Sequence, residues 1–151
     1  MKQGLGTQLR HLIELLDGAV QDAYAEAGLD YRPRYTPVMR ALAGGQPHTV
    51  SQIAEAAGIT QPAATQTVAL MVKEGWLLAQ SSPTDARQKL LLLSPQGKRL
   101  LPKLQACWRA TAAAADDLDA ELPHPLSETL ARAIEALEQR PFSERIRQAK
   151  E

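Results

Sequence analysis

The sequence is short of cysteine and of aromatic residues, and each shortage excludes a class of protein. Its one cysteine, Cys107, cannot build an internal disulfide framework, so a reducing, cytoplasmic location is expected. One Phe, two Trp and three Tyr leave the core to Leu, Ala, Val and Ile, which suit packed helices better than a β-sandwich. The length of 151 residues is that of one domain.

Long apolar runs and an excess of charge are also lacking. No stretch reaches the roughly 18 consecutive apolar residues of a membrane-spanning helix, and acidic residues near the N-terminus are untypical of a signal peptide. We therefore expect no membrane partner. The 17 basic and 17 acidic residues give a formal net charge of zero. Residues 49–100 still carry a small positive excess, which gives weak support for contact with nucleic acid.

Apolar residues spaced by three and four predict four helices in the first half of the chain, at residues 5–28, 36–42, 50–57 and 60–75. The last two are joined by a short turn at Gly58, which predicts a helix-turn-helix. Thr60 is expected to cap the second of them, with Pro62 in its first turn, where a missing N–H costs little. The expected inward stripe of that helix is Ala64, Val68, Met71 and Val72.

A β-hairpin and two more helices complete the expected order. Residues 76–80 and 90–93 are short apolar segments on either side of a polar loop, which predicts a hairpin. A seven-residue apolar period from Leu100 to Leu118 predicts a helix that packs along another helix. Residues 126–137 carry the last strong helical stripe before Pro141.

The second helix of the helix-turn-helix has the side chains of a DNA-reading surface. Gln61, Thr65, Gln66 and Ala69 lie opposite its buried stripe, and they are polar or small enough to enter a major groove. Glutamine can bond an adenine edge through two hydrogen bonds, and threonine can offer its methyl group to thymine. The hairpin follows at once, and from it Arg87 and Lys89 could reach the DNA backbone or the minor groove. An αα-hairpin alone also occurs for packing only.

These residues resemble the MarR-type regulators, the multiple-antibiotic-resistance group of winged-helix proteins. The resemblance lies in the segments Ser51–Ile59, Thr60–Val68, Glu74–Leu77, Asp85–Arg87 and Leu93–Gly97. It implies a mainly α fold of one MarR-like domain, residues 1–151. A winged helix-turn-helix lobe (35–99) with a small β-hairpin wing would lie between long dimerisation helices (1–34 and 100–151).

The resemblance also implies a function and a set of contacts. The chain would be a homodimeric transcriptional regulator, of repressor type, that binds a pseudo-palindromic operator in double-stranded DNA and is released by a small-molecule effector. Arg87 would enter the minor groove, and Asp85 would hold the wing by pairing with a nearby basic residue. The expected DNA-contacting residues are Thr60, Gln61, Pro62, Thr65, Gln66, Ala69, Asp85, Arg87 and Lys89.

The wing departs from the family pattern in ways that predict fewer phosphate contacts. Ala86 stands where a second basic residue is common, and Ala79-Gln80 ends the first strand without the usual arginine. With the zero net charge, this keeps a second hypothesis open: a winged-helix module that binds proteins and not DNA.

Two further features have both a functional and a structural interpretation. Tyr24, Tyr31 and Tyr35 could bind a small aromatic or phenolic effector, with Arg32 or Arg34 as counter-charge, or they could pack the junction between helices. Cys107 could be a redox switch, but a thiol on an apolar helix stripe is usually inert.

Catalysis and metal binding are not expected. The histidines are scattered and have no acidic or cysteine partner at ligand spacing. The run Asp116-Asp117-Leu118-Asp119 is typical of a solvated helix face, and there is no glycine-rich phosphate loop or nucleophile elbow. We expect no cofactor and no enzyme activity.

Overall fold

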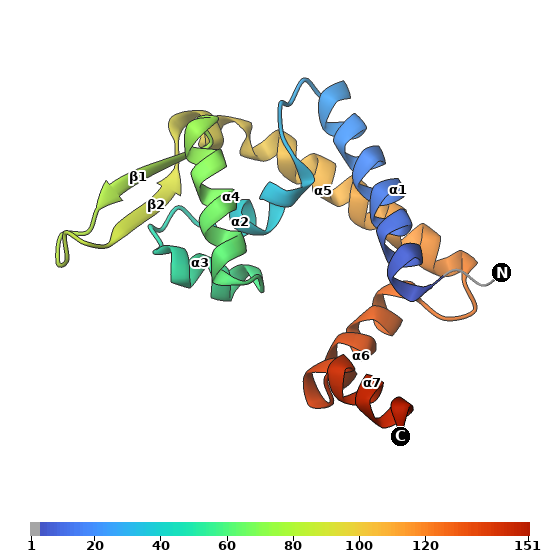
Figure 1. Ribbon diagram of the computed structural model, residues 1–151. Helices are drawn as coiled ribbons and strands as arrows, with labels where there is room; N and C mark the ends of the chain where they lie inside the picture. The colour runs from blue at the N-terminus through green and yellow to red at the C-terminus, as the bar shows by residue number, and fades with distance from the viewer. Residues whose placement is uncertain (1–3) are drawn as a thin grey trace. The chain divides into compact units, whose positions relative to one another are not determined.

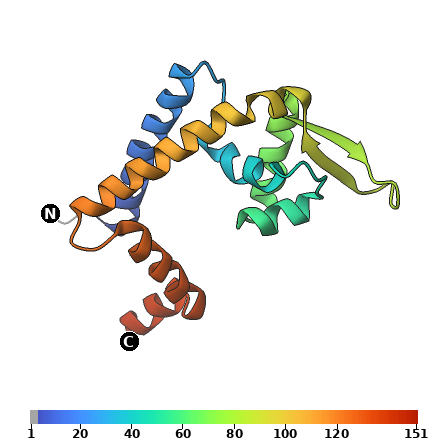
Figure 2. The same cartoon turned by 180° about the vertical axis from the view of Figure 1, so that it is seen from behind.

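A computed structural model describes residues 4–151 and shows a mainly helical chain with a two-stranded antiparallel hairpin (Figures 1 and 2). This confirms the fold class expected from the sequence. The elements are α1 (Leu5–Glu26), the 3-10 turn η1 (Pro33–Tyr35), α2 (Thr36–Leu42), α3 (Val50–Ala57), α4 (Gln61–Lys73), β1 (Leu77–Ser81), β2 (Lys89–Leu93), α5 (Pro95–Glu121), α6 (Leu126–Gln139) and α7 (Phe142–Lys150).

The described chain divides into two compact units, with the boundary inside α5 between Cys107 and Trp108. The helices expected from apolar spacing are all present. Helix α7 was not predicted, because Pro141 indicated only the end of α6. In the structure Pro141 also caps the start of α7, where its fixed φ and its lack of an N–H do no harm. None of the helices formed by residues 4–151 is long and apolar enough to cross a membrane.

The helix-turn-helix is fixed by local hydrogen bonds that the sequence makes predictable. Thr49 forms a capping box with Gln52: its hydroxyl accepts from the Gln52 N–H at 3.2 Å, and the Gln52 side chain accepts from the Thr49 N–H at 2.9 Å. The Thr60 hydroxyl accepts from the Ala63 N–H at 3.2 Å and caps α4. Between the helices Gly58 has φ +68°, a left-handed conformation that glycine adopts without strain.

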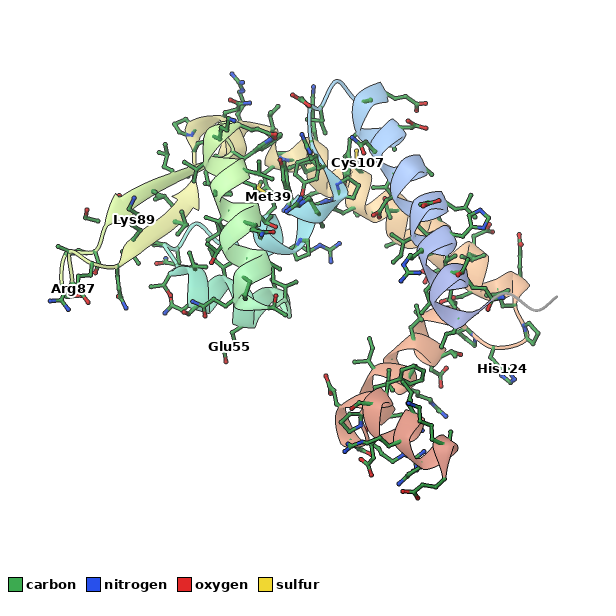
Figure 3. The ribbon with its side chains drawn as sticks, in the orientation of Figure 1. Met39, Glu55, Arg87, Lys89, Cys107 and His124 are labelled. Atoms are coloured by element: carbon green, nitrogen blue, oxygen red, sulfur yellow. The ribbon has the colours of Figure 1, made fainter. Side chains whose placement is uncertain are left out.

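Helix α2 is the centre of the first unit's core. It packs against α3, α4 and β2, and its Val38, Met39 and Leu42 are fully buried (Met39 is labelled in Figure 3). Ile53 of α3 and Met71 of α4 complete the same core with no exposed surface. Because α2, α3 and α4 share this one core, the packing determines which face of α4 is left exposed to solvent.

The hairpin has one buried and one open face. Its register pairs Leu77 with Leu93 and Ser81 with Lys89, so Leu77, Leu91 and Leu93 share the face turned to the core and are buried. The outer edge of β2 is also paired, since the backbone of His48 exchanges hydrogen bonds of 2.8 and 3.0 Å with Leu91. The base of the hairpin is therefore held on both sides, and its tip extends beyond α3 and α4 (Figure 1).

The end of α4, the start of β1 and the start of α5 are held together at one point. The Ser94 hydroxyl donates to the Gly75 carbonyl at 2.6 Å and accepts from the Gly97 N–H at 2.9 Å, and the Ser94 N–H donates to the Trp76 carbonyl at 3.0 Å. A Cβ atom on Gly97 would lie 2.5 Å from the Trp76 carbonyl oxygen. Only glycine permits this approach of α5 to the base of the wing.

The second unit, Trp108–Glu151, is organised by two caps. The Asp119 carboxylate accepts hydrogen bonds from the Ser127 hydroxyl and from the N–H groups of Leu126 and Ser127, which start α6. The Ser127 hydroxyl is the main reason why the pKa of Asp119 is lowered. Arg145 donates to the carbonyls of Ala136 and Arg140 at the other end of the helix.

The terminal helices keep apolar stripes exposed in the single chain. The exposed apolar side chains are Leu5, Leu9, Ile13, Leu15 and Leu16 on α1, Leu130, Ile134 and Leu137 on α6, and Phe142 and Ile146 on α7. Side chains of this kind, repeated along a helix, are typical of a surface that is covered in an assembly.

The contact at Gly97 predicts a large effect from a small substitution. Gly97→Ala should lower the free energy of unfolding by about 1–3 kcal/mol, because the added methyl group meets a backbone oxygen that cannot move alone. Gly44→Ala is the matched control: a Cβ atom added there would meet nothing within 4 Å, so it should change stability by less than about 0.5 kcal/mol. Urea denaturation measures both, and equal stability of the two variants would contradict the proposed role of Gly97.

Candidate nucleic-acid interface

The outward face of α4 carries the side chains expected there from the sequence. Gln61, Pro62, Thr65, Gln66 and Ala69 are all exposed. The buried face consists of Ala64, Thr67, Val68 and Met71. The expectation that Val72 belongs to the buried stripe was wrong: Val72 is 36% exposed, and Thr67 is buried in the stripe. The exposed face is therefore a narrow row of short polar and small side chains on a well-supported helix.

Two residues of this face are already hydrogen-bonded within the helix-turn-helix. The Thr60 hydroxyl serves the cap of α4. The Gln61 side-chain oxygen accepts a hydrogen bond of 3.2 Å from the Ser51 hydroxyl, which belongs to α3. Sequence reasoning missed Ser51, since the two residues are ten positions apart and no local pattern links them.

The wing presents Arg87 at its tip and Lys89 at the first position of β2, both exposed (Figure 3). The resemblance implied that Asp85 pairs with a basic side chain. In the structure its carboxylate instead accepts the backbone N–H of Arg87 at 2.9 Å, and its carbonyl accepts the N–H of Gln88 at 3.1 Å. Asp85 thus shapes the turn through the backbone and leaves the Arg87 guanidinium outside it.

Three polar contacts join α4 to the segment that precedes α2. The Tyr35 hydroxyl donates to Glu74 Oε2 at 2.7 Å, and Arg32 reaches Glu74 Oε1 at 3.5 Å. Arg34 donates to the Thr67 hydroxyl at 3.3 Å. Burial, followed by the hydrogen bond to Glu74, raises the pKa of Tyr35 from 10.0 to about 12. These contacts hold the middle and the end of α4.

The tyrosines of the expected effector site are packed against one another. Tyr31 makes edge-to-face contacts with Tyr24, Tyr35 and Trp76, at centroid distances of 4.6, 5.6 and 5.2 Å. All four rings are at most 2% exposed. The hydroxyls of Tyr24 and Tyr31 lie 3.4 and 3.0 Å from the Thr36 hydroxyl. The cluster thus contributes to the core of the first unit.

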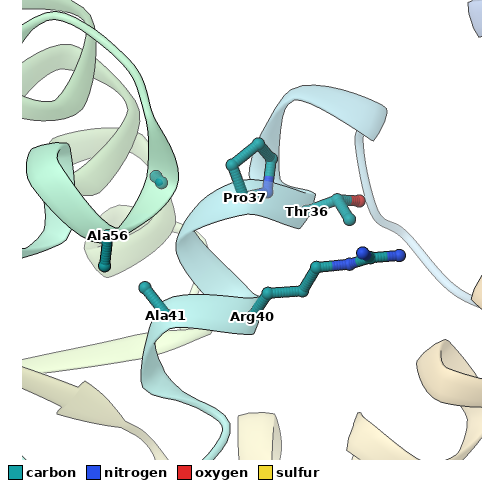
Figure 4. Close-up of a pocket in the computed structure, with 6 residues that line it drawn as sticks. Thr36, Pro37, Arg40, Ala41 and Ala56 are labelled. Carbon is teal, nitrogen blue, oxygen red and sulfur yellow. The ribbon is translucent and has the colours of Figure 1, made fainter. Parts of the chain in front are cut away.

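A groove lies between α2 and α3, at a place that no sequence pattern predicted (Figure 4). Its volume is about 490 Å³, and its lining is apolar apart from one hydroxyl and one guanidinium. The lining residues are Thr36, Pro37, Arg40, Ala41, Ala56 and Ala57. Elsewhere, Cys107 is half-buried on α5. Residues 4–151 contain no group of three or more His, Cys, Asp or Glu side chains that could hold a metal ion.

Two short helices joined through a left-handed glycine and followed directly by a hairpin define the winged helix-turn-helix class. The MarR family model matches residues 28–88, which include both helices, β1 and the wing loop. The winged-helix segment of this chain is thus similar to the MarR family, as its motifs indicated. A comparison with curated protein sequences found no significant match.

Solved structures share the fold over most of the chain. A "probable transcriptional regulator" from Pseudomonas aeruginosa is 23% identical, with a TM-score of 0.62 over 89% of this chain and 97% of that one. MepR of S. aureus, solved as a DNA complex, is 14% identical, with a TM-score of 0.69 over 91% and 98%. BpsR of Bordetella bronchiseptica, whose DNA binding is regulated by 6-hydroxynicotinic acid, is 15% identical, with a TM-score of 0.63 over 92% and 94%.

The contact between Tyr35 and Glu74 predicts a pH-dependent loss of stability. Tyr35→Phe should lower the free energy of unfolding by about 1–2 kcal/mol at neutral pH, since it removes a hydrogen bond to a charged group. The raised pKa means that this contribution is intact below pH 10.0 and is lost as the pH rises towards about 12. The stability difference between the two proteins should therefore shrink over that window.

Thermal unfolding followed by circular dichroism from about pH 7 to pH 11.5 measures this difference. Glu74→Gln is the control, because an amide oxygen can still accept the Tyr35 hydrogen bond and the exposed Arg32 pair adds little. A difference between wild type and Tyr35→Phe that stays constant across the alkaline range would show that the hydroxyl does not interact in this way.

Proposed function

We propose that this protein is a sequence-specific DNA-binding transcriptional regulator of repressor type. The observation that carries the proposal is the outward face of α4. It combines Gln61, Thr65 and Gln66 on a capped helix whose other face is fully used by the core. A helix of this kind fits the major groove, and its amides can read base edges. Structural relatives solved as DNA complexes support the same docking.

The wing supplies the second contact of the proposed complex. Arg87 projects from the turn at the tip of the hairpin, where a guanidinium can enter the negative potential of a narrow minor groove. Lys89 lies nearby and can meet a phosphate. Because these are the main cations of the wing, the electrostatic share of binding is small, and affinity should fall only moderately with salt.

We further propose that the protein acts as a homodimer on a pseudo-palindrome, with half-site centres about 10 base pairs apart. The exposed apolar stripes of α1, α6 and α7 support this, since they are expected to be covered in a dimer formed by residues 1–34 and 100–151. Light scattering should give twice the chain mass of 16.4 kDa at micromolar concentration. Leu137→Asp should reduce it, because a charge would be buried in an apolar seam. A wild-type protein of single-chain mass would refute the dimer.

Release by a small aromatic or phenolic effector completes the proposal. Tyr24, Tyr31, Tyr35 and Arg32 supply rings, hydroxyls and a positive charge, which a ligand would reach by displacing the packed rings. One structural relative responds to a hydroxylated aromatic acid. A ligand that engaged the Tyr35 hydroxyl would break its bond to Glu74 and so loosen the end of α4. Titration of the protein–DNA complex with 6-hydroxynicotinic acid and related phenols tests this, and an unchanged complex would count against it.

Substitutions in the recognition helix and in the wing should weaken DNA binding in different ways. Gln66→Ala should weaken binding to the best selected site by about 1–3 kcal/mol if the amide makes two base contacts, and should affect random DNA far less. Arg87→Ala should weaken both complexes alike and reduce the salt dependence by about one charge. We expect the separation because one side chain lies on the outward face of α4 and the other is a charge at the end of a turn.

Fluorescence titrations at several salt concentrations measure both effects. Gln139→Ala and Arg147→Ala, on α6 and α7, are the matched controls and should leave DNA affinity unchanged. The assignment is wrong if Gln66→Ala binds the selected site as tightly as wild type, or if Arg87→Ala leaves the salt slope unaltered. Absence of any binding to duplex DNA at low salt would favour the alternative of a protein-interaction module.

A further inference from the structure

Glutamine side chains at a DNA interface can present either end of their amide. The oxygen accepts a hydrogen bond and the NH₂ group donates, and a rotation of the terminal torsion exchanges the two. A free glutamine can therefore suit several bases, so its selectivity depends on what fixes the amide. Gln61 is exposed at the first position of α4, which makes its orientation important for readout.

In this protein the Gln61 amide contacts the neighbouring helix through its oxygen. The Ser51 hydroxyl of α3 donates to Gln61 Oε1 at 3.2 Å. Among residues 4–151, no other hydrogen bond to the Gln61 side chain is present, so both hydrogens of its Nε2 remain available. The amide is thus turned with its oxygen towards α3 and its donor end towards the solvent side of the interface.

The support for Ser51 is itself firm. Ser51 is the second residue of α3, two positions after the Thr49 N-cap of the capping box, and that helix is anchored by the fully buried Ile53. Gln61 is the first residue of α4, directly after the Thr60 cap. The two side chains are therefore presented by helix ends whose backbone is held by caps, and the hydrogen bond between them joins the two helices of the motif.

We propose that Ser51 is a positioning residue that makes Gln61 a selective donor to the major groove. This inference rests on the proposed DNA-binding function and specifies one of its contacts. Guanine, adenine and thymine each offer an acceptor at the major-groove edge, whereas cytosine offers only its N4 donor. An amide whose donor end faces the DNA should bind the first three and exclude cytosine at the base it contacts.

The isosteric pair Ser51→Thr and Ser51→Val tests this, because the two variants differ only by a hydroxyl in place of a methyl group. Sites are selected from a random duplex library with wild type, both variants and Gln61→Ala. Gln61→Ala identifies the position, since the base preference there should disappear. Wild type and Ser51→Thr should deplete cytosine at that position, and Ser51→Val should admit it. Ser51→Val should also bind the best wild-type site about fivefold more weakly, the loss expected for one exposed hydrogen bond.

Each outcome separates this inference from the proposed function. If Ser51→Val selects the same sites as Ser51→Thr while Gln61→Ala alters one position, Ser51 has no positioning role and DNA reading stands. If Gln61→Ala selects the wild-type sites, Gln61 reads no base and the inference is overturned. If wild type selects no site, the proposed function itself fails. Melting temperatures of the Thr and Val variants should agree.

Discussion

The arrangement of α4 and the wing depends on the approach of the first turn of α5 to the backbone of Trp76. At Gly97 that approach leaves no room for a side chain, and Ser94 uses its hydroxyl and its N–H to bind the carbonyls of Gly75 and Trp76. Helix α4 ends and the wing begins at those carbonyls. Their geometry is therefore set together, by backbone contacts that tolerate little change. The wing cannot shift its base without shifting the end of α4.

The opposite side of α4 is held by side chains and not by backbone. Tyr35 and Arg32 meet Glu74 at the end of the helix, and Arg34 meets Thr67 near its middle. Such contacts are individually modest and lie close to the surface. The junction at the wing is rigid, whereas the polar contacts on the α2 side are looser. A change in the position of α4 is therefore easiest on the α2 side. The tyrosine cluster is thereby linked to the recognition helix.

Local signals account for what the sequence could predict, and long-range pairing for what it could not. Caps such as Thr49 and Thr60 act within one turn, and the hairpin follows from two short apolar segments on either side of a polar loop, so helix order, the wing and the exposed face of α4 were all accessible. The contacts of Ser51 with Gln61 and of Tyr35 with Glu74 join residues 10 and 39 positions apart, which no periodicity reveals. Helix α7 was missed because proline ends and starts helices alike.

The near absence of excess charge gives these long-range contacts their importance. A protein rich in lysine and arginine can bind DNA through phosphates alone and tolerate imprecise base contacts. Here the wing offers Arg87 and Lys89, and α4 offers uncharged amides and hydroxyls on its outward face. In the proposed complex, binding must then come from well-placed hydrogen bonds, and an ordered amide loses less freedom on binding than a free one. The hydrogen bonds that orient side chains before contact thus replace part of the attraction that charge would supply.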